Sequence, residues 1–111
     1  MRIHIAQPTE QECYGSDATA EDARTVAQNC LALAEEYARH HWPDASITTE
    51  LVSHAMSVNS AADAPDGRPT CLGGRDWVTE QINDYISRHW TAEPLWEKAF
   101  DAKEYLAKYP R

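Results

Sequence analysis

The feature that most constrains the fold is one long amphipathic segment, residues 19–42, with the sequence TAEDARTVAQNCLALAEEYARHHW. At about 100° per residue, its apolar side chains fall on one helical face and its charged side chains on the other. Thr19 and Asp22 predict an N-terminal capping box. Pro43 predicts the C-terminal end, because a residue before proline disfavours the helical region. The predicted buried face is rich in alanine and consists of Ala23, Val26, Ala27, Cys30, Leu33, Ala34, Tyr37, Ala38 and His41.

Two segments with alternating or β-branched residues predict a small sheet. Residues 2–7 alternate between apolar and polar and predict a short strand that ends at Pro8. Residues 44–59 predict a second strand whose apolar phase changes at the adjacent Leu51 and Val52. Either a bulge at this pair or a bend between two bonded halves would keep both halves facing the core.

The C-terminal half predicts a long loop followed by two helices. Residues 60–75 are rich in turn residues, with the possibility of a short strand, and residues 76–90 and 94–109 show helical periodicity. Two strands alone make a poor sheet, so a third is expected from this loop or from a second copy of the chain. The order β-α-β-(loop or short β)-α-α predicts a small α+β layer fold in one domain, residues 1–111, with the long helix packed on a small sheet.

Composition and charge argue against several classes of protein. The chain has 111 residues and a formal net charge of −8 at pH 7, which argues against binding nucleic acid through a basic patch. The N-terminal sequence MRIHIAQPTE lacks the apolar run of a signal peptide, and no segment is long and apolar enough to span a membrane. From three cysteines without a CxxC pair we expect no disulfide framework. We therefore expect a cytoplasmic protein.

The negative charge is concentrated in the N-terminal half. Residues 1–60 hold nine Asp or Glu against three Arg, a local charge of −6, whereas residues 61–111 hold nine against seven Arg or Lys, a local charge of −2. Two acidic pairs on the outer face of the long helix lie about 21 Å apart at about 1.5 Å per residue, far sparser than the phosphates of duplex DNA. This face is therefore expected to dock on a basic protein surface, through Glu21, Asp22, Glu35, Glu36 and Asp17.

A second candidate site lies at the ends of two predicted helices, where a Tyr and a His are four residues apart. Tyr37 and His41 end the first helix, and Tyr85 and His89 end the second. These side chains could face a shared cleft, in which phenols relay protons to imidazoles. The sequence favours a structural role instead, because an imidazolium stabilises a helix C-terminus and the aromatic rings can form an edge of the core.

The loop of residues 60–75 would form the other side of such a cleft. Cys71 lies in a glycine-rich stretch near Arg68 and Arg75, and neighbouring arginines lower the pKa of a thiol. The loop has neither GxxxxGK nor GxGxxG, the two common phosphate-binding patterns. An ordinary connecting loop is the favoured interpretation.

No catalytic motif is present, and the His and Cys residues match no metal-ligand spacing, although His4 and His54 could meet across paired strands. We expect no metal ion, no cofactor, and a binding protein rather than an enzyme. In size and charge the chain resembles small bacterial or phage inhibitors of nucleic-acid-handling defence complexes, such as anti-CRISPR proteins. The resemblance implies a larger protein or ribonucleoprotein with a basic surface as the partner, without direct contact with nucleic acid or a membrane. The alternatives are a small enzyme or ligand-binding domain, and a dimeric structural or accessory protein.

Overall fold

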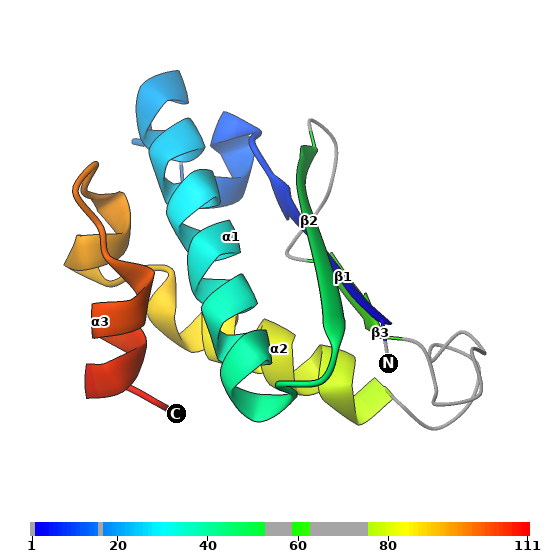
Figure 1. Ribbon diagram of the computed structural model, residues 1–111. Coiled ribbons are helices and arrows are strands. Elements are labelled where there is room, and N and C mark those ends of the chain that lie inside the picture. Colours follow the sequence, from blue (N-terminus) through cyan, green and yellow to red (C-terminus); the bar gives the residue numbers. More distant parts are fainter. Residues whose placement is uncertain (1, 16, 53–58, 63–75) are drawn as a thin grey trace.

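The computed structural model describes residues 2–15, 17–52, 59–62 and 76–111 (Figure 1). Its elements follow the predicted order and form an α+β fold. They are β1 (Arg2–Pro8), the 3-10 helix η1 (Gln11–Tyr14), α1 (Ala20–His41), β2 (Ser46–Val52), β3 (Asn59–Ala62), α2 (Asp76–His89), the 3-10 helix η3 (Glu93–Trp96) and α3 (Ala102–Lys108).

The sheet has the strand order β2-β1-β3, with β1 parallel to β2 and antiparallel to β3. The register between β1 and β2 runs without interruption from Arg2 opposite Ser46 to Pro8 opposite Val52. The predicted bulge at Leu51 and Val52 is therefore wrong, because both residues pair with β1 in an unbroken register. The third strand comes from the chain itself, at residues 59–62, where the long loop was expected to begin.

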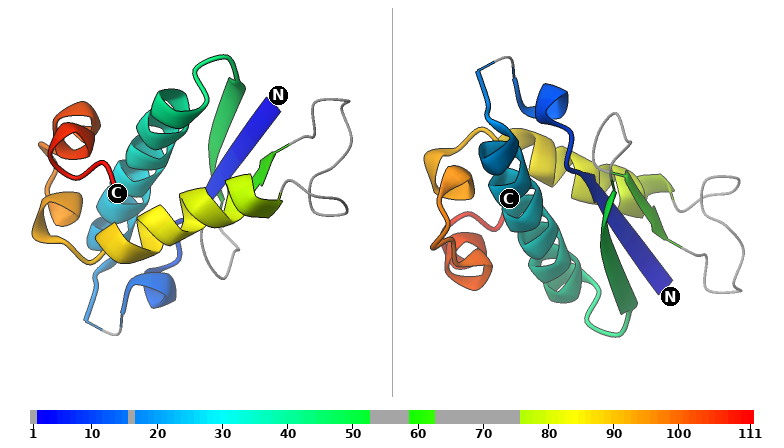
Figure 2. Two further views of the ribbon diagram at one scale, coloured as in Figure 1. Left: turned by 90° about the horizontal axis from the view of Figure 1, so that it is seen from below. Right: turned by 90° about the horizontal axis from the view of Figure 1, so that it is seen from above.

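The elements form three layers (Figures 1 and 2). Both α1 and α2 pack on one face of the sheet, α1 against β1 and β2 and α2 against β3. The third layer, η3 and α3, packs on the other side of α1. The long helix is therefore the central element, enclosed between the sheet and the C-terminal segment.

The predicted ends and buried face of α1 are confirmed, with one exception. The Thr19 hydroxyl accepts from the Asp22 amide at 3.0 Å, the Asp22 carboxylate accepts from the Thr19 amide at 3.3 Å, and Trp42 leaves the helical conformation before Pro43. The buried residues of α1 are those predicted except His41, which is exposed. The Tyr37 ring occupies the buried position at this end of the helix, and His41 packs against it with ring centroids 4.3 Å apart.

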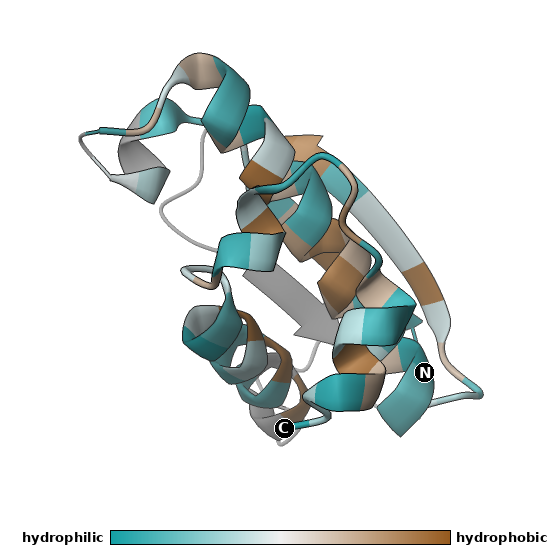
Figure 3. Ribbon diagram, turned by 90° about the vertical axis from the view of Figure 1, so that its left-hand side faces the viewer, coloured by the Kyte–Doolittle hydropathy of each residue, from teal (hydrophilic) through white to brown (hydrophobic). Residues whose placement is uncertain are grey.

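The core between α1, α2 and the sheet is built from aliphatic side chains. Ile3 and Ile5 of β1 belong to this core, together with three aliphatic residues of the helices. All five are exposed by 1% or less; the helical residues are Leu33, Ile82 and Ile86. Full burial of one such side chain contributes about 1.5–3 kcal/mol. In Figure 3 the hydrophobic residues of the helices turn mainly inward and the hydrophilic residues outward.

The prediction of one helix over residues 94–109 is wrong, because the structure divides it into η3 and α3. The Asn29 side-chain amide donates to the carbonyl oxygens of Leu95 (2.9 Å) and Glu97 (2.8 Å). In a continuous α-helix those carbonyls would accept from amides four residues later. The Asp101 carboxylate accepts from the Glu104 amide at 3.1 Å and so begins a separate helix.

Candidate functional site

The structure brings together the four Tyr and His side chains that the sequence places at two helix ends. The rings of Tyr37 and Tyr85 stack at 4.2 Å with an interplanar angle of 21°, and both tyrosines are buried. His41 packs on Tyr37, and His89 packs on Tyr85 with ring centroids 4.4 Å apart. We call these four residues the Tyr/His cluster. It fastens the ends of α1 and α2 to each other.

Polar atoms of Tyr85 and His89 are bound by the C-terminal segment of the same chain. The Tyr85 hydroxyl donates to the Tyr109 carbonyl at 2.6 Å. His89 Nε2 lies 3.0 Å from the Arg111 backbone oxygen, and its Nδ1 lies 2.8 Å from the Tyr105 hydroxyl. A neutral imidazole satisfies both contacts, because Nε2 can donate to the carbonyl while Nδ1 accepts from the phenol.

The electrostatics of the Tyr/His cluster favour neutral groups. Burial raises the pKa of Tyr85 well above its usual value, and the neighbouring tyrosines add to the effect. The pKa of Tyr105 is raised in the same way, by burial first and by Tyr109 second. Partial burial and the adjacent His40 lower the pKa of His41, while a hydrogen bond to the backbone of Pro110 partly opposes them. The raised pKa values of the phenols and the lowered pKa of His41 both favour uncharged forms, which is typical of side chains with a structural role.

The loop side of the predicted cleft lies outside the described residues. Arg68, Cys71 and Arg75 lie in residues 63–75, and His54, the possible partner of His4, lies in residues 53–58; both ranges are outside the described residues. Of the cysteines whose side chains the structure describes, Cys30 is buried in α1, and burial raises the pKa of its thiol to about 12. Cys30 therefore acts as a small apolar residue of the core.

The acidic outer face of α1 is partly compensated within the molecule. Glu21 pairs with Lys98 at 2.5 Å, and Glu35 pairs with Arg39 at 3.0 Å. Asp22 serves in the capping box, Glu36 is half-buried, and Asp17 is exposed before the helix. Exposed ion pairs contribute only about 0–1 kcal/mol, so a partner could exchange them at little cost. Two carboxylates of this face, those of Glu21 and Glu35, therefore already have basic partners within the chain.

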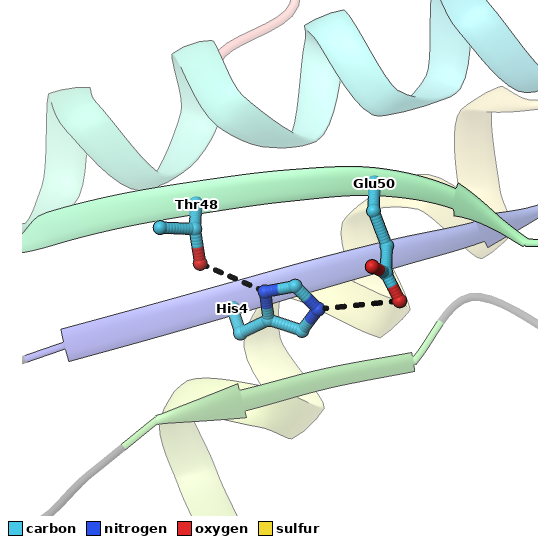
Figure 4. A network of polar contacts seen from close by, with 3 residues as sticks. All are labelled: His4, Thr48 and Glu50. Atoms are coloured by element: carbon cyan, nitrogen blue, oxygen red, sulfur yellow. Dashed lines mark hydrogen bonds and ion pairs between the residues drawn. The ribbon is translucent and has the colours of Figure 1, made fainter.

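A polar network lies on the opposite face of the sheet, which no described helix covers (Figure 4). His4 Nδ1 lies 2.7 Å from the Thr48 hydroxyl, and His4 Nε2 lies 3.7 Å from a Glu50 carboxylate oxygen. A hydroxyl, an imidazole and a carboxylate in a row have the composition of a nucleophilic triad. The side chains of His4 and Glu50 are 48% and 55% exposed, so water competes for every contact. We interpret the network as a cross-strand contact.

The pocket between η3 and α3 is the feature that sequence reasoning missed. It has a volume of about 260 Å³. Three aromatic rings follow one another along it, with centroids 5.6 Å apart for Phe100 and Tyr105 and 4.8 Å apart for Tyr105 and Tyr109. Its remaining lining residues are Pro94, Glu97, Ala99, Asp101, Glu104 and Lys108. We call it the C-terminal pocket.

The C-terminal pocket combines aromatic surface with negative charge. Three carboxylates, from Glu97, Asp101 and Glu104, stand against the single ammonium of Lys108, which gives the lining a charge of −2. Lys108 lies 3.4 Å from Glu104, and both side chains are about two-thirds exposed. The sequence signal was the mixture of acidic and aromatic residues over residues 97–109. On a continuous helix most of these side chains would share one face, at i, i+3 and i+4 spacing, so the pattern alone does not distinguish a pocket from a solvated helix face.

Among the described residues, no three His, Cys, Asp or Glu side chains are arranged to hold a metal ion. No described helix is both long enough and apolar enough to cross a membrane. Comparisons with protein-family models, with curated proteins and with solved structures give no match for this chain.

Proposed function

We propose that this protein is an acidic protein-binding module, and that its C-terminal pocket takes up a Lys or Arg side chain from a larger, basic partner. The observation that carries the proposal is the row of three aromatic rings beside three carboxylates. A cation over an aromatic face is attracted by the ring quadrupole, by about 0.5–1 kcal/mol at exposed sites and about 2 kcal/mol when desolvated. The carboxylates add charge-assisted hydrogen bonds.

The size of the C-terminal pocket supports a side chain rather than a small-molecule substrate. Pockets that hold drug-sized ligands span about 300–1,000 Å³, whereas this pocket has about 260 Å³. One extended Lys or Arg side chain has a shape that fits such a groove, with its aliphatic part on the rings and its charge at the carboxylates. A small enzyme has less support, because the Tyr/His cluster binds its own C-terminal segment.

The charge distribution supports the wider proposal about the partner. A net charge of −8 raises the association rate with a positive surface. Proteins that hold nucleic acid present such surfaces, rich in Lys and Arg. We therefore extend the proposal to a bacterial or phage inhibitor that acts in the cytoplasm and occupies the basic surface of a nucleic-acid-handling complex. The resemblance in size and charge to anti-CRISPR proteins is the support for this extension.

A titration with a defined peptide tests the pocket. The probe is a short peptide of alternating arginine and glycine, and its control is the same peptide with neutral citrulline in place of arginine. We expect the arginine peptide to shift the NMR signals of Phe100, Tyr105 and Tyr109, and the citrulline peptide to bind more weakly. Phe100→Ala should weaken binding about fivefold to tenfold, in line with the loss of one cation–π contact.

A matched pair of charge variants separates the pocket from the general negative charge. Glu97→Gln removes a lining carboxylate, and Glu93→Gln removes an exposed carboxylate of η3 that does not line the pocket. Both variants change the net charge equally. Both variants should weaken binding of the arginine peptide slightly, because each removes one negative charge. Glu97→Gln should weaken this binding more, because it also removes a contact in the pocket. Equal losses in the two variants would show that the peptide binds the protein through its net charge and that the pocket has no role.

A further inference from the structure

The strand β2 forms one edge of the sheet, nearest the viewer in Figure 1. Within the described part of the chain, no strand pairs with its outer side. Natural edge strands are usually protected by a Lys, a Pro, a bulge or a short length. β2 has seven residues, SITTELV, continuous pairing with β1, and neither Lys nor Pro. Its one charged residue is Glu50, so β2 lacks most of the usual protections against pairing with another strand.

The geometry points to a second copy of this chain as the occupant of that edge: we propose that β2 pairs with β2 of another copy, antiparallel and centred on Thr49. This inference is independent of the C-terminal pocket. The resulting dimer has one continuous sheet of six strands, with the helical layers of both copies on the same face. The two C-terminal pockets lie outside the contact.

The backbone groups of β2 have the alternation that this pairing requires. The Thr9 amide donates to the Val52 carbonyl at 2.9 Å. In a parallel ladder, the N–H and C=O groups of successive residues point alternately to opposite sides of the strand. The even-numbered residues of β2 therefore bond to β1, and Ile47, Thr49 and Leu51 direct their backbone groups outward. Antiparallel pairing about Thr49 joins outward-facing residues only, since Ile47 meets Leu51 of the second copy.

The side chains of β2 are complementary to themselves in this register. Ile47 and Leu51 are half-buried and lie at the rim of the core, so their contact across the two copies removes apolar surface from water. On the other face, Thr48 lies opposite Glu50 of the second copy. If His4 Nδ1 donates to the Thr48 hydroxyl over their 2.7 Å contact, that hydroxyl is free to donate to the carboxylate. Each favourable pair occurs twice because of the two-fold symmetry.

The other edge of the sheet is a poorer candidate. β3 has only four residues, Asn59–Ala62, and α2 packs against it. The cost of the β2 pairing is charge repulsion, because each copy carries −8. Salt screens this repulsion but does not weaken backbone hydrogen bonds or apolar contacts to the same degree. The dimer is therefore expected to become stronger as the ionic strength rises, whereas binding to a basic partner becomes weaker.

The proposal is tested by sedimentation equilibrium over micromolar to millimolar protein, at low and moderate salt. The wild type should show a monomer–dimer equilibrium. Thr49→Pro removes the outward N–H and leaves the bonds to β1 in place, so the dissociation constant should rise about tenfold or more, in line with the loss of one hydrogen bond per copy. Thr49→Val keeps the N–H and should dimerise like the wild type. Equal dissociation constants for these two variants would overturn the proposal, as would a wild type that stays monomeric throughout.

Two further measurements do not depend on the proline variant folding. Amide hydrogen exchange at Ile47, Thr49 and Leu51 should slow with rising protein concentration, while exchange at Thr48 and Glu50 should be slow at every concentration. Thr48→Lys should strengthen the dimer through Glu50 of the second copy, and Thr48→Glu should weaken it. Exchange rates independent of concentration, or the same shift in both Thr48 variants, would contradict the proposed register.

Discussion

The Tyr/His cluster and the C-terminal pocket are neighbouring regions, because Tyr105 and Tyr109 line the pocket and also contact the cluster, yet the two regions differ in what their polar groups contact. In the cluster, the Tyr85 hydroxyl and both nitrogens of His89 meet partners in the same chain. In the pocket, the Glu97 carboxylate is exposed, and the rings of Phe100 and Tyr109 remain partly open to solvent.

The comparison shows that residue type alone does not identify a site. Tyrosines and histidines four residues apart are candidates for proton transfer by composition. Here the two tyrosine rings are buried against each other, and Tyr85 and His89 bind other groups of the same chain, which makes these residues a structural joint between helices. Glutamates and aromatic residues near α3 are ordinary surface residues by composition, but their grouping around a cavity makes them available to a ligand. The distinction depends on which contacts the chain itself has already filled.

The largest expected effect is on stability, from truncation inside the Tyr/His cluster. Tyr37→Ala removes a buried ring stacked on Tyr85 and leaves a cavity between α1 and α2. We expect a loss of about 3–5 kcal/mol in the free energy of unfolding, as for other buried aromatic residues. Urea denaturation followed by circular dichroism measures it. The control, Tyr109→Ala, truncates a residue that is 51% exposed and should cost much less; equal losses would mean that the cluster is not a core element.

A smaller loss is expected when one hydroxyl is removed from the same cluster. Tyr85→Phe keeps the stacked ring and deletes the donor to the Tyr109 carbonyl. The net loss should be about 0.5–1.5 kcal/mol, the usual contribution of a hydrogen bond. Hydrogen exchange should also speed up at residues 109–111, since the C-terminal segment loses one of its attachments. A variant with unchanged stability and unchanged exchange would show that this segment is held by other contacts.

Charge reversal on the outer face of α1 should have a still smaller effect on stability. Its main effect should be on the rate of binding. Glu35→Lys together with Glu36→Lys reverses two charges while leaving the capping box of Asp22 intact. Glu35 loses its pair with Arg39, so the expected loss of stability is below about 1 kcal/mol. The association rate with the arginine peptide should fall and depend less on salt, because charges at the rim act mainly on the rate of encounter. Unchanged rates at both salt concentrations would remove this face from the encounter surface.

The sequence predicted what depends on local spacing. The buried face of α1, its capping box and its end before Pro43 follow from residues within a few positions of one another. The element order and the α+β class follow from the same kind of signal. His41 was placed wrongly, because helical periodicity cannot show that Tyr37 already fills the buried position at that end.

The C-terminal pocket could not be predicted, because it depends on contacts between distant residues. Asn29 lies 66 positions before Leu95, and its side-chain amide binds the carbonyls that a helix over residues 94–109 would have used. One local signal was present, since Asp101 followed by Glu104 three residues later is an N-terminal capping pattern. The pairing of the third strand is equally non-local, because β3 at residues 59–62 pairs with β1 at the start of the chain.

The smallest expected effect is the pH dependence that His41 contributes to stability. Its pKa in the folded protein is lowered from the ordinary value of 6.5, chiefly by partial burial and then by His40. The unfolded chain therefore binds a proton at this site more readily than the folded protein does, and stability from this group rises with pH. The contribution is fully present above pH 6.5 and is lost as the pH falls through the folded pKa.

The measurement is the melting temperature of wild type and His41→Gln between neutral pH and pH 5, compared as a difference so that other titrating groups cancel. Glutamine keeps a polar side chain without a titrating proton, so the wild type should lose slightly more stability on acidification than the variant. Ser87→Ala, an exposed substitution on α2, serves as the control and should follow the wild type. A difference of the opposite sign would mean that protonated His41 is stabilised in the folded protein, for example by the hydrogen bond to the Pro110 backbone. The C-terminal segment would then bind His41 more tightly in acid, and the contrast between a neutral cluster and a charged pocket would no longer hold.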